Sequence, residues 1–159
     1  MEKMMPNYDF NLDLPIAQKT ERQVAEFLVE KGGMTFLEDC DNNAYDLKMQ
    51  TNNGTELTIE VKEDFSCERT GNVGVEYECR GKASGIMVSQ ATAYLYKIHE
   101  PSQRIGLYVI PTKELKQMIK RQEYFRVVNG GDPGSNSMNY LFKLDVIKEN
   151  FKYLGSVPW

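Results

Sequence analysis

The sequence predicts an α/β fold in which helices flank a mixed central sheet, and three observations support this class. Residues 56–64 alternate apolar and polar side chains, as a half-buried strand does, and the turn signal Asn-Asn-Gly at 52–54 joins them to a similar run at 44–51. Residues 104–111 are almost continuously apolar, which is typical of a strand buried on both faces. Helical periodicity at 21–31 and 113–125 adds amphipathic helices on either side of these strands.

The start of the chain is predicted to be an extended arm, because residues 1–18 hold two prolines and no sustained period. Residues 19–159 are predicted to form a single domain. Its first helix is expected at about 21–31, because Thr20 and Gln23 have capping-box spacing and a Gly-Gly pair at 32–33 supplies the stop.

The remaining elements follow from local patterns. A third strand is expected within 72–80, and residues 88–98 are either a short helix running into a strand or a strand alone, with aromatic content favouring the strand. Thr112 is expected to cap the helix at 113–125, and the Gly/Ser/Asn-rich stretch 129–139 is expected to be a loop. Residues 140–151 should form a strand that passes into a short helix, which gives the order α-β-β-β-(α)-β-α-β.

Size and composition favour one cytoplasmic domain. A chain of 159 residues with 41% hydrophobic and 26% charged residues can bury one core. No apolar run approaches the roughly 20 residues of a membrane span, and the first residues lack the apolar region of a secretory signal, so no membrane partner is expected. The odd, widely spaced Cys40, Cys67 and Cys79 fit reduced cytosolic thiols, and the single His99 excludes a histidine-based metal cluster or triad.

Charge is distributed unevenly along the chain. Residues 1–80 hold 8 Lys and Arg against 17 Asp and Glu (net −9), whereas residues 81–159 hold 11 against 6 (net +5). An acidic half that binds divalent cations and a basic half that binds phosphate would give this asymmetry. Chance clustering of surface charge, or an acidic face that binds a partner, would give it equally well.

One acid-x-Lys triplet is distinguished by its context. Such triplets occur at 46–48, 60–62 and 114–116, but only Glu60 and Lys62 lie on the polar face of a strand whose hairpin partner carries another acid, Asp46. Two carboxylates within a few Å repel by about 4 kcal/mol at an effective dielectric of 20 unless a cation lies between them. Mg²⁺, which takes oxygen ligands and is usually held by one or two carboxylates plus substrate phosphate, is the predicted cation.

With these residues the sequence resembles the PD-(D/E)xK nuclease superfamily, in particular its Holliday-junction-resolvase-like and phage-type endonucleases. The resemblance rests on Asp46, on Glu-Val-Lys at 60–62, and on a first helix that places Glu21 near its start. It covers residues 20–125, and Gln90 to Tyr94 is similar to the QxxxY element of recombination-type nucleases. The resemblance implies a restriction-endonuclease-like α-β-β-β-α-β core.

The resemblance also implies Mg²⁺-dependent hydrolysis of a phosphodiester, with Mn²⁺ as a substitute. Asp46, Glu60, the backbone carbonyl of Val61 and Glu21 would be the metal ligands, and Lys62 would orient or activate the attacking water. Each residue has a structural alternative: an exposed Glu60–Lys62 ion pair, a solubilising acid at a strand edge for Asp46, and a first-turn acid favoured by the helix dipole for Glu21.

Further residues are candidates for binding DNA. Arg80, Lys82 and Ser84 belong to a glycine-containing stretch in which a backbone can approach phosphate closely. Lysines 113, 116 and 120 share one helical face, and Gln90 comes from the QxxxY resemblance. A glycine-rich turn and a solvent-facing helix explain the same residues. Glu76 and Glu78 are predicted to lie two apart on the same strand face, where they could form a second carboxylate pair, although solvated side chains are the favoured interpretation.

The leading hypothesis is a small DNA endonuclease that recognises branched or duplex DNA by shape and phosphate, because no base-reading module is visible. The resemblance suggests a homodimer. The alternative is a catalytically silent nuclease-fold subunit that binds DNA or protein in a restriction, repair or phage system. A third class is an acidic interaction module. Salt-sensitive DNA binding separates the third class from the first two, and metal-dependent cleavage separates those two.

Overall fold

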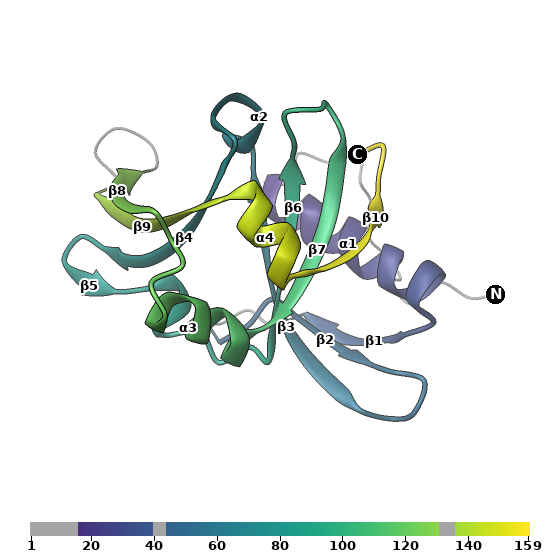
Figure 1. The fold of residues 1–159 in the computed structure, drawn as a ribbon. Helices are drawn as coiled ribbons and strands as arrows, with labels where there is room; N and C mark the ends of the chain where they lie inside the picture. Colours follow the sequence, from purple (N-terminus) through teal and green to yellow (C-terminus); the bar gives the residue numbers. More distant parts are fainter. Residues whose placement is uncertain (1–15, 40–43, 131–135) are drawn as a thin grey trace.

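The computed structural model describes residues 16–39, 44–130 and 136–159 (Figure 1). The predicted arm up to residue 15, Cys40 and part of the predicted loop (131–135) lie outside these residues. The strands are β1 (Thr35–Asp39), β2 (Leu47–Gln50), β3 (Glu56–Asp64), β4 (Asn72–Cys79), β5 (Lys82–Ala83), β6 (Ala93–His99), β7 (Ile105–Pro111), β8 (Arg126–Gly130), β9 (Ser137–Lys143) and β10 (Lys152–Ser156). The helices are α1 (Ile16–Gly32), α2 (Cys67–Thr70), α3 (Thr112–Lys120) and α4 (Leu144–Asn150), with a 3-10 turn η1 (Gly85–Met87).

The strands form two sheets. A six-stranded sheet has the order β1-β2-β3-β6-β7-β10, and a four-stranded sheet has the order β5-β4-β9-β8. The predicted hairpin is present, with Leu47 opposite Ile59 in antiparallel pairing. On its other side β3 pairs with β6 in parallel, with Val61 opposite Leu95. The prediction of an α/β fold with a mixed sheet and flanking helices is therefore confirmed, whereas the restriction-endonuclease-like order of the core stays a prediction.

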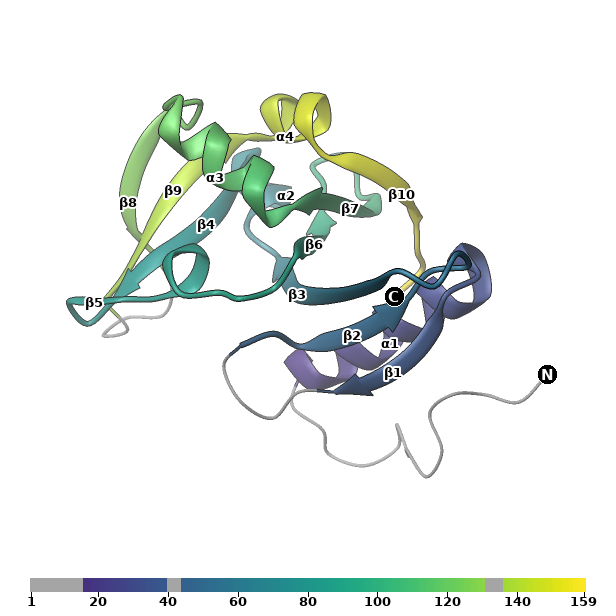
Figure 2. The same cartoon turned by 90° about the horizontal axis from the view of Figure 1, so that it is seen from below.

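The six-stranded sheet separates two apolar clusters, and its central strands β6 and β7 are buried on both faces. On one face, α1 packs Val24, Ala25 and Leu28 against the side chains of β2, β3, β6 and β7. On the other face, Tyr94, Tyr96 and Ile98 from β6 and their neighbours on β7 meet α3, α4 and the second sheet. Figure 2 shows α1 on one side of the first sheet and α3 and α4 on the other. No helix in the described part of the chain is long and apolar enough to cross a membrane.

The first helix begins earlier than predicted. It starts at Ile16, so residues 16–18 of the predicted arm are helical and Thr20 is an interior residue rather than an N-cap. The Thr20 hydroxyl is buried and donates a hydrogen bond of 2.7 Å to Glu63 Oε1 on β3. This hydrogen bond to the sheet takes the place of the predicted capping interaction. The helix ends at Gly32, and Gly33 adopts a left-handed φ of +66°, as the Gly-Gly stop predicts.

Several other boundaries differ from the predictions. The third strand exists as β4, but it belongs to the second sheet. Thr112 is the first residue of α3, not its cap, and α3 ends at Lys120 because Gln122 takes a left-handed φ of +56°. Residues 88–98 resolve into a short turn region followed by strand β6, and the predicted passage from a strand into a short helix corresponds to β9 and α4. The sequence patterns did not predict β1, β8 and β10.

Candidate functional site

Three of the residues predicted to bind metal or activate water, together with the predicted DNA contact Ser84, meet in a cavity of about 300 Å³ beside the start of β2. Asp46 directly precedes β2, while Glu60 and Lys62 project from β3 on the face away from α1. Lys62 Nζ lies 3.3 Å from Glu60 Oε2. The opposite wall comes from the second sheet and η1 and includes Ser84 and Gly85. The β2–β3 hairpin therefore brings Asp46, which precedes β2, close to Glu60 and Lys62 of β3, and all three line one cavity.

Asp46 is held by the backbone of β3. Its backbone N–H donates to the Ile59 carbonyl at 2.9 Å, and its Oδ2 accepts a hydrogen bond of 2.7 Å from the N–H of Val61. The backbone pairing of β2 with β3 ends at Leu47. The Asp46 carboxylate therefore accepts the hydrogen bond from β3 that the backbone of a further β2 residue would otherwise accept. Because the N–H and C=O of one strand residue point to the same side, the Val61 carbonyl is directed to the edge where Asp46 lies.

Glu21 joins this group from α1. The pKa of Glu21 is raised to about 7, first by burial and then by the carboxylates of Asp46, Asp39 and Glu60, with Arg22 acting in the opposite direction. Burial also raises the pKa values of Asp46 and Glu60 above their ordinary range, partly offset by the Val61 hydrogen bond to Asp46 and by the charge of Lys62 on both acids. Neighbouring carboxylates with raised pKa values form a site that a cation would stabilise.

Asp39 is a member of this acidic group that the sequence patterns did not indicate. It ends β1 opposite Leu47, and its Oδ2 accepts a hydrogen bond of 2.7 Å from Arg22 Nη2. Arg22 is itself buried, so this ion pair fixes the start of α1 to the edge of the sheet next to Glu21. No pattern in residues 35–39 predicted a strand, so nothing in the sequence placed this acid near the site.

The donor set fits Mg²⁺ held together with a substrate rather than by a complete protein cage. Within the described residues, no three His, Cys, Asp or Glu side chains are arranged to bind a metal ion by themselves. Asp46, Glu60 and the Val61 carbonyl nevertheless supply hard oxygen donors at one edge, and Mg²⁺ is commonly bound by one or two carboxylates, waters and substrate phosphate.

The raised pKa of Glu21 predicts a pH-dependent stability. A carboxyl with a folded-state pKa near 7 stabilises the fold below its unfolded pKa of about 4.5, and this contribution is lost as the pH rises through 7. We expect Glu21→Gln to stabilise the metal-free protein by about 1–2 kcal/mol at pH 8, after allowing for solvent screening, and to change little at pH 4. Urea denaturation at both pH values measures the difference.

The matched control for this prediction is Glu149→Gln, on the exposed surface of α4. It removes the same charge from a different helix and is expected to leave stability nearly unchanged at both pH values. Equal effects of the two substitutions at pH 8 would contradict a local carboxylate cluster around Glu21.

A second groove, of about 550 Å³, brings together three of the residues predicted to bind DNA. Gln90 lies on one of its sides, and Lys116 and Lys120 project from α3 on the other, together with Lys113. Ser89 lines both this groove and the cavity that holds Glu60. The basic face of α3 therefore borders the acidic site across Ser89, which is where a phosphate backbone approaching Glu60 and Asp46 would pass.

The structure separates the other predicted DNA contacts. Ser84 lines the cavity, where its hydroxyl donates a hydrogen bond of 2.8 Å to Glu76 Oε2. Arg80 and Lys82 are exposed at the β4–β5 turn. They line neither the cavity that holds Glu60 nor the groove beside α3.

The prediction that Glu76 and Glu78 share a strand face is wrong. A bulge between them places them opposite Asn139 and Met138, successive residues of β9 that face opposite sides of the sheet.

Tyr94, the last residue of the Gln90–Tyr94 element, lies deeper than its neighbours. It is 1% exposed, and it lines a cleft that also contains Lys62. The pKa of the Tyr94 phenol is raised to about 12, first by burial and then by the charges of Glu60, Asp46 and Glu76, with Ser89 acting in the opposite direction. The phenol therefore stays protonated at neutral pH and is available as a neutral hydrogen-bond donor beside the carboxylates.

Comparisons with known proteins give little further information. No family model matches the chain, and no curated protein matches it. Among solved structures, the bacterial homing endonuclease I-Ssp6803I is similar over 65% of this chain and 72% of that chain, with 21% sequence identity and a TM-score of 0.47. At that TM-score and identity the likeness carries no argument about this chain, so the site has to be judged on its own geometry.

Proposed function

We propose that the protein is a Mg²⁺-dependent DNA endonuclease of the PD-(D/E)xK type. The observation that carries the proposal is the convergence of Asp46, Glu60 and Lys62 in one cavity, with the Val61 backbone at its edge. A structural ion pair would account for Glu60 and Lys62 alone. It would not account for the half-buried Asp46 and Glu21, where the charge of Asp46 helps to raise the pKa of Glu21 and a bound cation would offset the repulsion.

In this proposal Asp46, Glu60 and the Val61 carbonyl hold the metal, and Glu21 adds a carboxylate from the α1 side. The metal would polarise the phosphate and lower the pKa of a water. Lys62 orients the attacking water and balances charge on the phosphate, since its ammonium is anchored by Glu60 at 3.3 Å and remains 39% exposed to the cavity. Tyr94, which lines the adjoining cleft, would donate a hydrogen bond from its hydroxyl to the substrate phosphate.

DNA would approach along the lysine face of α3. Gln90, Lys116 and Lys120 line a groove that borders the acidic site at Ser89, so phosphates bound there would lead a strand towards Glu60. Such contacts are independent of sequence and weaken as salt displaces them. The runner-up function, a silent subunit that binds DNA without cutting, uses the same groove and lacks only the metal step. The homodimer stays a prediction.

The test is cleavage of a labelled panel of linear, nicked, flapped and four-way DNA with Mg²⁺, with Mn²⁺ or with chelator. We expect strand cleavage that requires metal and that falls at least 100-fold in Asp46→Asn, because this variant loses the ligand charge while keeping an oxygen for the Val61 N–H. Cleavage by neither metal, with salt-sensitive binding retained, would leave the silent subunit as the function. Absence of both would exclude DNA as the partner.

A further inference from the structure

A third hollow, a cleft of about 700 Å³, begins at the candidate site and extends across the open face of the second sheet. Lys62 and Gly85 line both this cleft and the cavity of the site, so the two spaces are continuous. Its far part is lined by β4, β8 and β9, through side chains that point away from the apolar core between the sheets. In Figure 1, α2 lies at the top of the molecule, where it contributes Arg69 and Thr70 to this cleft, whereas α3 lies towards the bottom.

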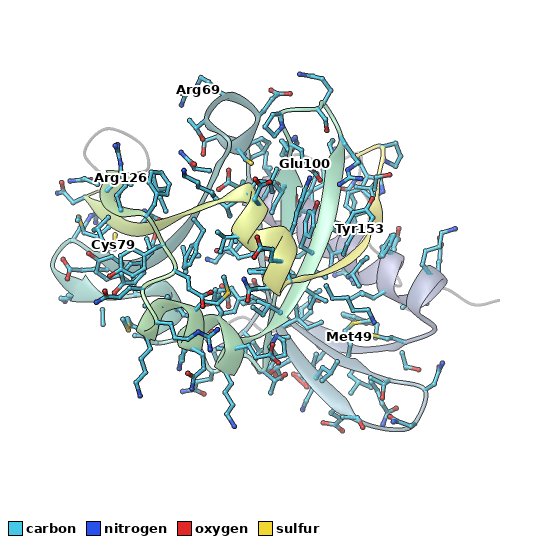
Figure 3. The ribbon with its side chains drawn as sticks, in the orientation of Figure 1. Met49, Arg69, Cys79, Glu100, Arg126 and Tyr153 are labelled. Carbon is cyan, nitrogen blue, oxygen red and sulfur yellow. The ribbon has the colours of Figure 1, made fainter. Side chains whose placement is uncertain are left out.

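The acidic and basic side chains of the cleft differ in whether they are paired within the protein. Its acids are engaged by internal donors: Glu63 accepts from Thr20 and binds Lys97, Asp64 accepts from the N–H groups of Cys67 and Gly74, and Glu76 accepts from Ser84. Two of its cations, Arg69 on α2 and Arg126 on β8, form no salt bridge with any residue that the structure describes. Figure 3 shows both guanidinium-bearing side chains in the same upper part of the molecule. The cleft thus presents guanidinium donors to an outside ligand.

An asparagine lies at the centre of the open sheet face. Asn139 on β9 stands between β4 and β8, and a glycine on each side leaves room for its amide. A Cβ added to Gly74 would lie 3.2 Å from Asn139 Oδ1, and one added to Gly130 would lie 3.1 Å from Asn139 Nδ2. In the pairing of β8 with β9, Val128 lies opposite Asn139 and Arg126 lies opposite Leu141. The Asn139 amide and the Arg126 guanidinium therefore belong to neighbouring cross-strand pairs on the same face of the β8–β9 ribbon.

These groups match base edges better than phosphate alone. An amide pairs with the N6 and N7 edge of adenine, and a guanidinium pairs with the O6 and N7 edge of guanine. The major groove admits a two-stranded ribbon, and β8–β9 forms the outer pair of its sheet. We propose that the open face of β4, β9 and β8 reads bases in the major groove of duplex DNA through Arg126 and Asn139. This inference rests on the proposed function and adds sequence preference to it.

The experiment selects bound duplexes from a library of randomised base pairs, using the full chain in chelator so that binding alone is read. We expect the wild type to enrich a sequence, and Asn139→Ala and Arg126→Ala each to lose preference at one or two positions, where the preferred base is favoured by about 5- to 150-fold. Asn139→Asp keeps the shape of the side chain but only accepts hydrogen bonds, so its position should change from adenine towards cytosine.

Two controls make the result specific. Asn129→Ala makes the same change on the reverse face of β8 and should leave the selected sequence unchanged. Lys116→Ala should weaken binding to all sequences alike and reduce the salt dependence. Binding without enrichment in the wild type would overturn the inference while leaving the proposed nuclease intact. Enrichment without any cleavage in Mg²⁺ would overturn the nuclease and leave base reading standing, and loss of all binding would overturn both.

Discussion

Replacing Lys62 with Met should lower metal-dependent cleavage by about 10²- to 10³-fold and leave the fold intact. The substitution keeps the apolar stem and removes the ammonium that lies 3.3 Å from Glu60 Oε2. The loss is of this size because a fixed charge acting on a developing phosphate anion in an enclosed site is worth several kcal/mol of transition-state energy. Stability should change by less than about 1 kcal/mol, because the ion pair is partly exposed.

The chain offers a matched control for this substitution on the neighbouring strand. Lys48 of β2 lies 3.5 Å from Glu56 Oε1 and belongs to another acid-x-Lys triplet. Lys48→Met should leave cleavage within about twofold of the wild type, because it removes a surface pair outside the cavity. Single-turnover cleavage rates, with unfolding curves for both variants, give the comparison. If the two substitutions reduced the rate equally, Lys62 would have no special role in the reaction.

Gly85→Ala is expected to have the largest effect on stability, about 2–5 kcal/mol. Gly85 adopts a left-handed φ of +53°, and an added Cβ would lie 2.2 Å from the carbonyl oxygen of Glu76. The left-handed conformation costs a non-glycine residue about 1–2 kcal/mol, and the overlap with rigid backbone adds about 1–3 kcal/mol more. Because Gly85 forms a wall of the site, the shift that relieves the overlap should also move Ser84 and reduce cleavage.

Gly81→Ala separates the two causes. Gly81 has a similar left-handed φ of +77°, but an added Cβ there would meet no atom within 4 Å. It should therefore cost only the backbone part, about 1–2 kcal/mol, and leave cleavage unchanged. Urea unfolding of both variants measures the difference in the free energy of unfolding. Equal destabilisation would show that the contact between residue 85 and the Glu76 carbonyl is not a constraint.

The sequence predicted those parts of the site that depend on neighbouring strands. The turn signal at 52–54 fixed the β2–β3 register, and that register brings Asp46 to the backbone of Val61. Period and turn chemistry are local, so they survive in a single sequence. The approach of Glu21 from α1 was suggested by resemblance alone, because no local pattern records which helix crosses which sheet.

What the sequence did not reveal depends on long-range packing. Strand β4 has the alternation of any strand, and only its pairing with β9 places it in a second sheet. Thr20 has the spacing of a cap, but its bond to Glu63 forms across 43 residues. The bulge that separates Glu76 from Glu78 likewise arises from pairing with β9, which residue parity cannot foresee. Side-chain patterns predicted most of the helices and strands but not β1, β8 and β10, and the sheet in which each strand lies depends on its pairing partners.

The parallel pairing of β3 with β6 implies an order in which the site is assembled during folding. The β2–β3 hairpin closes a short turn, so it can form within microseconds and bring Asp46 and Glu60 together early. The segment that contains β4, β5 and η1 lies between β3 and β6 in the chain, so the β3–β6 pairing is a non-local contact that is expected to form more slowly than the hairpin. Because that same segment supplies Ser84 and Gly85, we expect the carboxylates to meet before this wall of the cavity is in place.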